Sequence, residues 1–366
     1  MSDPRPACLI TGAVSPYRRE PFRLLAEAEG VEVIAWGEEP GMEPGEGGPP
    51  VRQTTQGGAA RLVASGHYRA VICGLGGRVA LPAAFLAARR AGVPFVLWAS
   101  VWAHPRSAAH ALSALPTRVL YRHADAVVTY GPHVSAHVAR NRTDRSTIFE
   151  APQAVDVEHF GAPVAPERRL AARERAGAAD PEGFLVLFVG RLVPEKGVDV
   201  LLEAWQLARS RLGRHAVLAL AGEGLLRPAV EAAGEGVRAL GTVTREDLPA
   251  LYAAADVLVL PSVRTATFLE PWGLVINEAM LQGTPVIAST AVGAAVGGLV
   301  RHEMNGLITP QRDSQALAEA LFIMGDEPQR RRELGAAARE DALAYDASAW
   351  VHGVRQALRS MDASRL

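Results

Sequence analysis

The chain has 366 residues, about twice the length of a typical single domain, and 49% of them are hydrophobic, which predicts two domains with ample cores. The 38 lysine and arginine residues nearly balance the 39 aspartate and glutamate residues, so charge gives no reason to expect nucleic acid as the principal partner. The first apolar run is too short for a signal peptide, and no segment approaches the roughly 20 apolar residues of a membrane span. We therefore expect a soluble cytoplasmic protein.

Short apolar runs alternate with helical segments through the first half of the chain. Ala7–Thr11 stops at Gly12, and helical spacing follows over Pro21–Glu29. The stretch Gly37–Pro50 contains too few apolar residues to pack, so we expect a loop there. Further strands are expected at Val31–Trp36, Ala70–Cys73, Phe95–Trp98, Ala126–Tyr130 and Thr147–Glu150. Such alternation predicts an α/β domain with a parallel sheet covered on both faces.

A charged, alanine-rich segment over Gly161–Glu182 predicts an exposed helix and linker, and a second alternation begins after it. Its strands are expected at Phe184–Val189, Ala216–Ala221, Val237–Leu240, Val257–Leu260, Val286–Ala288 and Gly306–Ile308. Late helices are expected at Leu317–Met324, Glu333–Tyr345 and Ala349–Met361. We therefore place the domains at residues 1–165 and 166–346. Ligands of such sheets bind outside the carboxyl ends of the strands, which predicts a cleft between the halves.

Two carboxylates lie on either side of a predicted helix start. Pro271 and Gly273 argue against one continuous helix through Glu270 and Glu278, so the helix is expected to begin near Gly273 or Leu274. The free N–H groups of its first turn belong to Gly273, Leu274 and Val275. Amides at a positive helix end suit phosphate, and carboxylates suit hydroxyl groups. The alternative is a helix-entry pair that only offsets the helix dipole.

Two cations follow the strand Phe184–Val189. Arg191 lies in the turn after Gly190, and Lys196 lies just before the next helix. Both would then lie at the carboxyl end of the strand, where they could neutralise the charge of a leaving diphosphate without a metal. An isolated pair of this kind is more often a pair of solvated loop charges.

Taken together, these stretches resemble the retaining glycosyltransferases of family four, which have the GT-B fold of two Rossmann-like domains facing across a cleft. The resemblance covers nearly the whole chain, and it is carried by VGRLVPEKGVDVLLEAW, AGEGLLR and FLEPWGLVINEAMLQGTPVIAS. Glu270 and Glu278 match the family's E-x7-E pair. Trp272 stands where the family commonly has Phe, an exchange that bears on pocket width. The single Gly12 stands where the family often has paired glycines.

The resemblance implies a metal-independent enzyme that moves a sugar from a nucleotide-diphosphate sugar to an acceptor hydroxyl with retention at the anomeric carbon. Arg191 and Lys196 would hold the donor diphosphate, Glu278 the ribose hydroxyls and Glu270 the donor sugar. Further contacts are implied for Gly190, Gly12, Glu223 and, near the donor sugar, His104. A C-terminal helix within residues 347–366 would pack back on the first domain. No cofactor is implied, and the chain has no Asp-x-Asp metal motif.

The sequence does not identify the acceptor. A saccharide, a lipid-linked or a small-molecule acceptor fits, in cell-envelope glycan or natural-product biosynthesis. Arg18 and Arg19 could face an acidic acceptor or be solvated. The segment Ser107–Asp125 permits weak contact with an anionic membrane surface, although Pro116 favours an ordinary packed helix. The alternative functions are a GT-B sugar-nucleotide epimerase and a non-catalytic sugar-nucleotide-binding protein.

Overall fold

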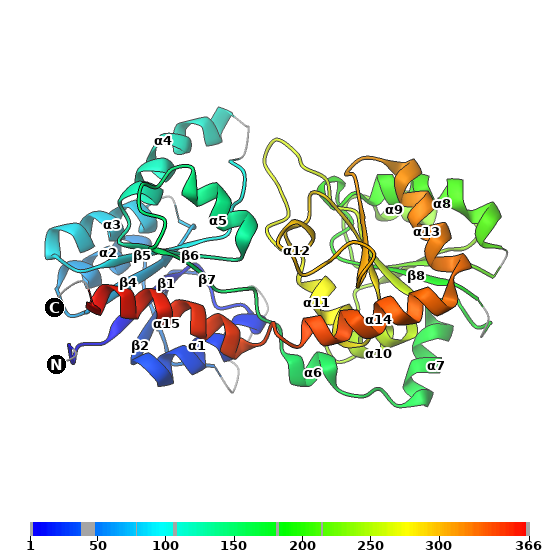
Figure 1. Cartoon of the computed structure of the whole chain (residues 1–366), viewed down its shortest axis with the longest axis horizontal. Helices are drawn as coiled ribbons and strands as arrows, with labels where there is room; N and C mark the ends of the chain where they lie inside the picture. The colour runs from blue at the N-terminus through cyan, green and yellow to red at the C-terminus, as the bar shows by residue number, and fades with distance from the viewer. Residues whose placement is uncertain are drawn as a thin grey trace. The chain divides into compact units, whose positions relative to one another are not determined.

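The computed structural model describes residues 3–37, 48–77, 79–104, 108–180, 183–213 and 215–363, which fall into two compact units (Figure 1). Unit 1 comprises Met1–Ala154 with Asp346–Leu366, and unit 2 comprises Val155–Tyr345. The boundary therefore lies at Ala154, not at residue 165, because α6 (Val157–Gly161) packs on α10 (Leu248–Ala254) and α11 (Leu274–Leu281) of unit 2. Residues 38–47 of the loop expected at Gly37–Pro50 lie outside the described residues.

In its described residues, unit 1 has a seven-stranded parallel sheet in the order β3-β2-β1-β4-β5-β6-β7. The strands are β1 (Ala7–Thr11), β2 (Val31–Ala35), β3 (Val51–Gln53), β4 (Ala70–Gly74), β5 (Phe95–Ala99), β6 (Ala126–Thr129) and β7 (Ile148–Glu150). The helices are α1 (Pro16–Glu29), α2 (Gln56–Ala64), α3 (Ala80–Ala91), α4 (Ala108–His123), α5 (Pro132–Ala139) and α15 (Ala347–Ala363).

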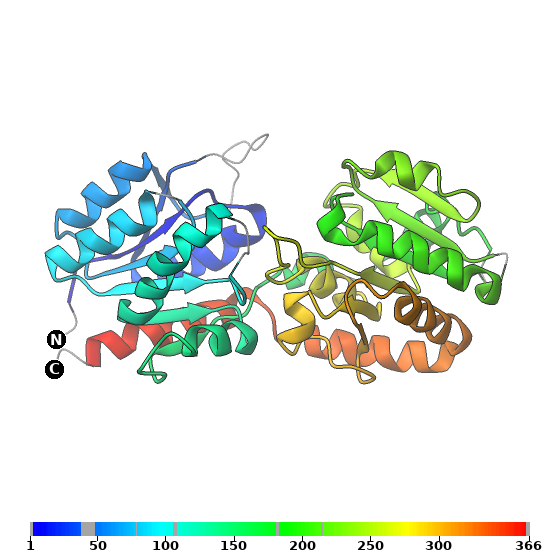
Figure 2. The ribbon, with the colours of Figure 1, turned by 90° about the horizontal axis from the view of Figure 1, so that it is seen from above.

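The terminal helix α15 completes unit 1 from the far end of the chain. Its Trp350 is 2% exposed, and its ring centre lies 5.4 Å from the ring centres of both Phe22 and Trp98. Arg355 donates to a carboxylate oxygen of Glu29 at 2.6 Å. Figure 2 shows α15 (red) and α3 (light blue) on opposite faces of the sheet. Helices on both faces leave the central strands buried, which explains their continuous apolar sequences.

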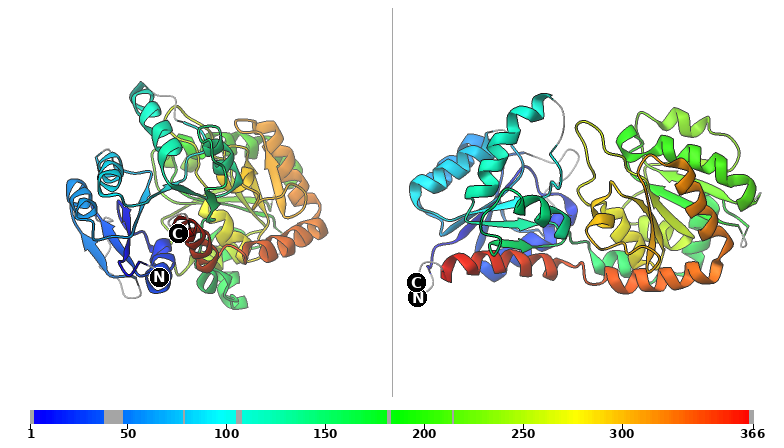
Figure 3. Two further views of the ribbon diagram at one scale, coloured as in Figure 1. Left: turned by 60° about the vertical axis from the view of Figure 1, so that its left-hand side comes forward. Right: turned by 45° about the horizontal axis from the view of Figure 1, so that its top comes forward.

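In its described residues, unit 2 has a six-stranded parallel sheet in the order β10-β9-β8-β11-β12-β13. The strands are β8 (Leu185–Val189), β9 (Val217–Ala221), β10 (Val237–Gly241), β11 (Val257–Leu260), β12 (Val286–Ser289) and β13 (Gly306–Thr309). Besides α6, α10 and α11, the helices are α7 (Pro166–Arg175), α8 (Val198–Leu212), α9 (Arg227–Glu231), α12 (Gly293–Val296), α13 (Ser314–Asp326) and α14 (Pro328–Ala342). Figures 1 and 3 show α13 and α8 side by side.

Every strand expected from the sequence is present, with each end shifted by one residue at most. The strand β3 was not expected. It lies at the edge of the sheet, where Arg52 and Gln53 are exposed, so it lacks the apolar pattern that marks a buried strand. Both units are thus Rossmann-like α/β domains, as the resemblance implied.

Candidate functional site

The predicted donor residues of unit 2 lie at or near one edge of its sheet. All its strands are parallel, so the loops after their carboxyl ends share that edge. The order of the strands reverses between β8, which continues to β9 and β10, and β11, which continues to β12 and β13. Open α/β sheets bind ligands at such a switch point because the loops diverge there. The loop after β8 carries Lys196 and the loop after β11 carries Glu270.

Lys196 and Glu270 form a shielded ion pair at this point. The Lys196 Nζ donates to Glu270 Oε2, and the Ser262 hydroxyl donates to the same oxygen at 3.1 Å. The two side chains are only 15% and 9% exposed, and Lys196 Nζ lies 5.7 Å from the centre of the Phe268 ring. An ammonium group has three donors, so its contact with Glu270 leaves others for a ligand. The pair therefore offers a cation and a carboxylate side by side.

Backbone contacts fix the position of Lys196. A 3₁₀ turn, η1 (Pro194–Lys196), ends at Gly197, whose φ of 68° is left-handed. A Cβ atom at Gly197 would overlap the carbonyl oxygen of Pro261 in the loop after β11. The N–H of Val263 donates to the carbonyl of Glu195 at 3.0 Å. The two loops are thus joined backbone to backbone, which fixes Lys196 relative to Glu270.

Replacing Gly197 by alanine is expected to loosen this junction. The left-handed backbone costs a side-chain-bearing residue about 1–2 kcal/mol, and the overlap with Pro261 adds to it. A loss of about 2 kcal/mol lowers the Tm of a unit this size by about 4–8 °C in a thermal unfolding experiment. Gly92→Ala is the matched control, since Gly92 has nearly the same backbone angles (φ 66°, ψ 25°) and open space around it. An equal loss of Tm in both variants would show that the contact with Pro261 does not matter.

Arg191 lies at the same edge but is not packed. Its side chain is 63% exposed, and its Nη2 atom lies 3.4 Å from Glu195 Oε1. A surface ion pair of this kind contributes about 0–1 kcal/mol, so a ligand can displace it at little cost. Arg191 therefore suits a phosphate contact that forms on binding, in contrast to the fixed Lys196.

Glycines bring the loop after β9 against the loop after β8. A Cβ atom at Gly222 would overlap the carbonyl oxygen of Gly190, and Gly224 is equally crowded by the next residues of that loop. The side chain of Glu223 between them is exposed and paired with Arg227. Gly190 and Gly222 thus set the backbone geometry, while the role of Glu223 toward a nucleotide stays a prediction.

The helix α11 begins where the sequence predicted. Gly273 has a φ of 97°, and a Cβ atom there would lie 2.6 Å from Leu260 Cδ2. No side chain caps this end of the helix, and its first turn holds no acidic residue. The N–H groups of Leu274 and Val275 have no partner within the helix itself, so they suit an anionic ligand. The helix ends at Leu281, before the expected stop at Gly283.

Glu278 lies inside α11 and pairs with a residue from α10. The Tyr252 hydroxyl, on a fully buried side chain, donates to Glu278 Oε2 at 2.6 Å. Burial raises the pKa of Glu278 to about 7, while the Tyr252 hydrogen bond and the charge of Arg245 work against this rise. The carboxyl group is therefore partly protonated near neutral pH, and Tyr252 fixes its orientation.

This pKa gives a pH dependence to donor binding if Glu278 accepts hydrogen bonds from ribose hydroxyls, because those bonds favour the ionised carboxylate. Affinity for a nucleotide sugar is then expected to fall as the pH drops below about 7, by up to tenfold per unit. Titration calorimetry between about pH 6 and 8 measures it. Glu278→Gln should flatten the profile, and a profile as steep in that variant as in the wild type would assign the effect to another group.

Two supporting residues escaped sequence reasoning. Tyr252 and Ser262 hold the carboxylates of Glu278 and Glu270, but neither has a local pattern that marks it. Tyr252 lies in a different segment from Glu278, and Ser262 lies in the same loop as Glu270. A signal did exist for Lys196. It is the only lysine of the chain, and the other 37 of the 38 basic residues are arginines. The one compact ammonium of the chain thus lies against Glu270.

Trp272 belongs to the core of unit 2. It is 2% exposed, its indole N–H donates to Asn277 Oδ1 at 2.8 Å, and its ring lies 5.6 Å from that of Tyr345. The exchange of Phe for Trp is matched by this buried hydrogen-bond acceptor. The bearing of this exchange on the width of a ligand pocket stays a prediction.

Gly12 and His104 belong to unit 1. Gly12 follows β1, and its carbonyl accepts from Gly37 N–H at 2.7 Å. His104 follows β5 and is half-buried. It lies close enough to His137 for its charge to lower the pKa of that imidazole, after the larger effect of burial. The roles of Gly12 and His104 toward a donor stay predictions.

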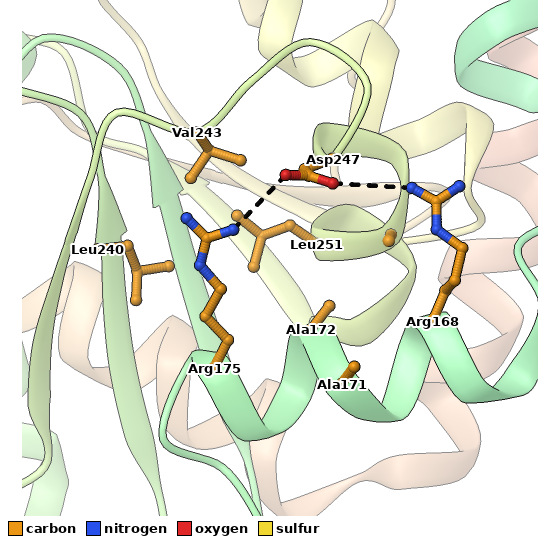
Figure 4. Close-up of a pocket in the computed structure, with 9 residues that line it drawn as sticks. Arg168, Ala171, Ala172, Arg175, Leu240, Val243, Asp247 and Leu251 are labelled. Carbon is orange, nitrogen blue, oxygen red and sulfur yellow. Dashed lines mark ion pairs between the residues drawn. The ribbon is translucent and has the colours of Figure 1, made fainter.

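A pocket of about 180 Å³ lies elsewhere in unit 2, between α7, α10 and the loop after β10 (Figure 4). Asp247 stands between two arginines, 3.8 Å from Arg168 and 3.7 Å from Arg175. The rest of its lining is apolar, including Leu240 and Leu251. No predicted donor residue lines this pocket, and both of its cations pair with Asp247, so we assign the pocket no part in donor binding.

The helix α4 exposes Leu115 and Val119 beside Arg118. Contact of this helix with a membrane surface stays a prediction. Within the described residues, no helix is both long enough and apolar enough to cross a membrane.

Comparisons with known proteins give a consistent result. The model of the family "Glycosyl transferases group 1" matches residues 183–327. The D-inositol 3-phosphate glycosyltransferase of Salinispora arenicola is 32% identical over 323 residues, which cover 80% of this chain and 68% of that protein. The enzyme of the same name from Streptomyces griseus is 32% identical, over 71% of this chain and 61% of its own length. The crystal structure of Anabaena Alr3699/HepE in complex with UDP and glucose has the same fold, with a TM-score of 0.76, 22% identity and coverage of 97% and 100% of the two chains.

Proposed function

Because the chain belongs to the family of glycosyl transferases group 1 and has the GT-B fold, we propose that it moves a sugar from a nucleotide-diphosphate sugar to an acceptor hydroxyl, with retention at the anomeric carbon and without a metal. The observation that carries the proposal is the Lys196–Glu270 pair at the switch point of the unit 2 sheet. The pair lies in loops next to the start of α11, which no side chain caps. Backbone amides, a cation and a carboxylate are therefore available at this edge of the sheet.

The proposed reaction breaks the bond between the anomeric carbon and the diphosphate oxygen and forms a bond to the acceptor oxygen on the same face of the sugar. The acceptor proton passes to the leaving diphosphate. Lys196 and Arg191 neutralise the charge that develops on the diphosphate, and each such donor supplies about 2–4 kcal/mol of transition-state stabilisation. Glu270 holds the sugar hydroxyls and stabilises positive charge at the reacting carbon. Glu278 accepts hydrogen bonds from the ribose hydroxyls, and Tyr252 orients the Glu278 carboxylate.

The acceptor class is a separate part of the proposal. The relatives of 32% identity are named for transfer to an inositol phosphate. We propose to screen acceptors of three classes: saccharides, lipid-linked glycans and small molecules. They would belong to cell-envelope or natural-product biosynthesis.

The test is product analysis by nuclear magnetic resonance. The protein is incubated with UDP-, GDP- and ADP-sugars, with and without acceptors, in the presence of EDTA. The expected product is a glycoside whose anomeric configuration equals that of the donor. An altered sugar nucleotide formed without acceptor would identify an epimerase, and a bound but unchanged donor would identify a non-catalytic binding protein. An inverted product, or activity abolished by EDTA, would overturn the corresponding part of the proposal.

A further inference from the structure

Unit 1 has its own switch point, and a pocket lies there. The strand order reverses between β1, which continues to β2 and β3, and β4, which continues to β5, β6 and β7. A pocket of about 320 Å³ opens at the carboxyl ends of these strands. It is lined by Thr11, Gly12, Arg18, Trp36, residues 74–77, Trp98, Ser100 and Tyr130. None of these lining residues is an aspartate or a glutamate.

Arg18, from the first turn of α1, is the only charged residue in this described lining. Its guanidinium lies 4.8 Å from the ring centre of Trp98, and Nη2 donates to the Tyr130 hydroxyl at 3.3 Å. Among the described residues no carboxylate pairs with Arg18, and its buried Nε–H has no acceptor. Arg18 is half-buried, and a cation shielded in this way gains from an anionic partner. An anionic ligand in the pocket would supply that partner.

A second side chain of this lining also has a buried donor without a partner. Trp98 is 4% exposed, and its indole N–H is buried without an acceptor in the described structure. The rings of Trp36 and Tyr130 complete an aromatic wall, and Thr11 and Ser100 add hydroxyl groups. Aromatic faces suit the C–H face of a sugar or cyclitol ring, and hydroxyls suit its rim. The lining thus fits a hydroxylated ring that carries an anionic group with several oxygens that accept hydrogen bonds.

We propose that this pocket binds the acceptor of the transfer reaction and that Arg18 selects an acceptor with an anionic group, a phosphate or a carboxylate, on a hydroxylated ring. The inference rests on the proposed function and names its substrate class. The guanidinium has five N–H donors, more than its bond to Tyr130 occupies, so others are left for the oxygens of either anion. Arg18 also lies against Phe22 and Trp350, so a purely structural role is the competing explanation that a test must separate.

The test compares anionic acceptors with their neutral counterparts. Inositol 1-phosphate is paired with inositol, glucose 6-phosphate with glucose, and glucuronate with glucose. Phosphatidylinositol vesicles are added as a lipid source of the same headgroup chemistry. The wild type is expected to prefer an anionic acceptor, free or in vesicles. Arg18→Gln should raise the KM of that acceptor about 10- to 100-fold, while the KM of the nucleotide sugar changes less than twofold. Arg18→Lys, which keeps the charge, should recover part of the loss.

Arg23→Gln is the matched control, since Arg23 lies on the same helix and pairs with Glu20 and Glu27 at the surface. It should leave both KM values unchanged. Equal use of neutral and anionic acceptors by the wild type, or equal losses for both kinds in Arg18→Gln, would overturn the proposal. A raised KM for the nucleotide sugar alone would assign Arg18 to the donor.

Direct binding separates this inference from the proposed function. If the wild type transfers no sugar, titration calorimetry with inositol 1-phosphate and with inorganic phosphate still tests the pocket. Binding that is lost in Arg18→Gln and partly kept in Arg18→Lys would support the anion site without the reaction. Binding that is absent in the wild type, or unchanged in Arg18→Gln, would refute it.

Discussion

Replacing Lys196 by methionine is expected to lower kcat/KM for the donor by about 100- to 1,000-fold. The methionine keeps the length of the side chain but removes the donor that would neutralise the diphosphate, which is worth about 2–4 kcal/mol in the transition state. Steady-state transfer assays with the nucleotide sugar measure this loss. Because Lys196 is the only lysine, Lys196→Arg is informative too. The larger guanidinium should recover the charge but not the fit against Glu270, so most of the loss should remain.

Stability must be separated from catalysis in this variant. Removal of one partner from a shielded ion pair leaves the other charge uncompensated, which costs about 3–5 kcal/mol when the pair is buried. The double variant Lys196→Met with Glu270→Gln removes both charges and should regain most of the stability but none of the activity. Arg330→Met, which removes exposed ion pairs with Glu303 and Glu327, controls for loss of a surface cation. Near-normal transfer by a folded Lys196→Met protein would contradict the assignment of Lys196 to the donor diphosphate.

Replacing Glu270 by glutamine is expected to have the second large effect on sugar transfer. The shape and the acceptor for the Ser262 hydroxyl are kept, but the negative charge that the proposed mechanism places beside the reacting carbon is lost. We expect kcat to fall by at least about 100-fold, similar to the loss of one preorganised polar contact in other active sites. Binding of the nucleoside diphosphate itself should persist or tighten, because Lys196 no longer has an anionic partner in the protein.

The split between kcat and nucleotide affinity distinguishes this role from general damage. Transfer assays give kcat, and calorimetry with the nucleoside diphosphate gives the affinity. Glu319→Gln is the matched control, since Glu319 pairs with Arg211 at the surface of the same unit. A parallel loss of kcat and nucleotide affinity in Glu270→Gln would mean that Glu270 holds the loop and does not contact the sugar.

The fold was largely predictable because its signals are local. Buried parallel strands require continuous apolar runs, so segments such as Val257–Leu260 were found with their correct bounds. Gly273 and Pro271 marked the start of α11 for the same local reason. The strand β3 was missed because an exposed edge strand needs no apolar run.

The contacts within the site were less predictable because they join distant segments. Lys196 and Glu270 are 74 residues apart, and Tyr252 and Glu278 are 26 residues apart. Spacing placed Glu270 and Glu278 near one helix start, but it gave no sign of which side chain each carboxylate meets. For Arg18, the sequence left a solvated charge and an acceptor contact open. Its aromatic surroundings and its lack of a carboxylate partner emerge only in the folded unit.

Nucleotide binding by Lys196 variants tests the central claim most directly. UDP, GDP and ADP are titrated into the wild type, Lys196→Met and Glu270→Gln by calorimetry with EDTA present. We predict that the wild type and Glu270→Gln bind one of the three nucleotides and that Lys196→Met binds it at least about tenfold more weakly, in keeping with the loss of a charge-assisted contact. Equal affinity in the wild type and Lys196→Met, or no binding by the wild type, would contradict a diphosphate site built on Lys196.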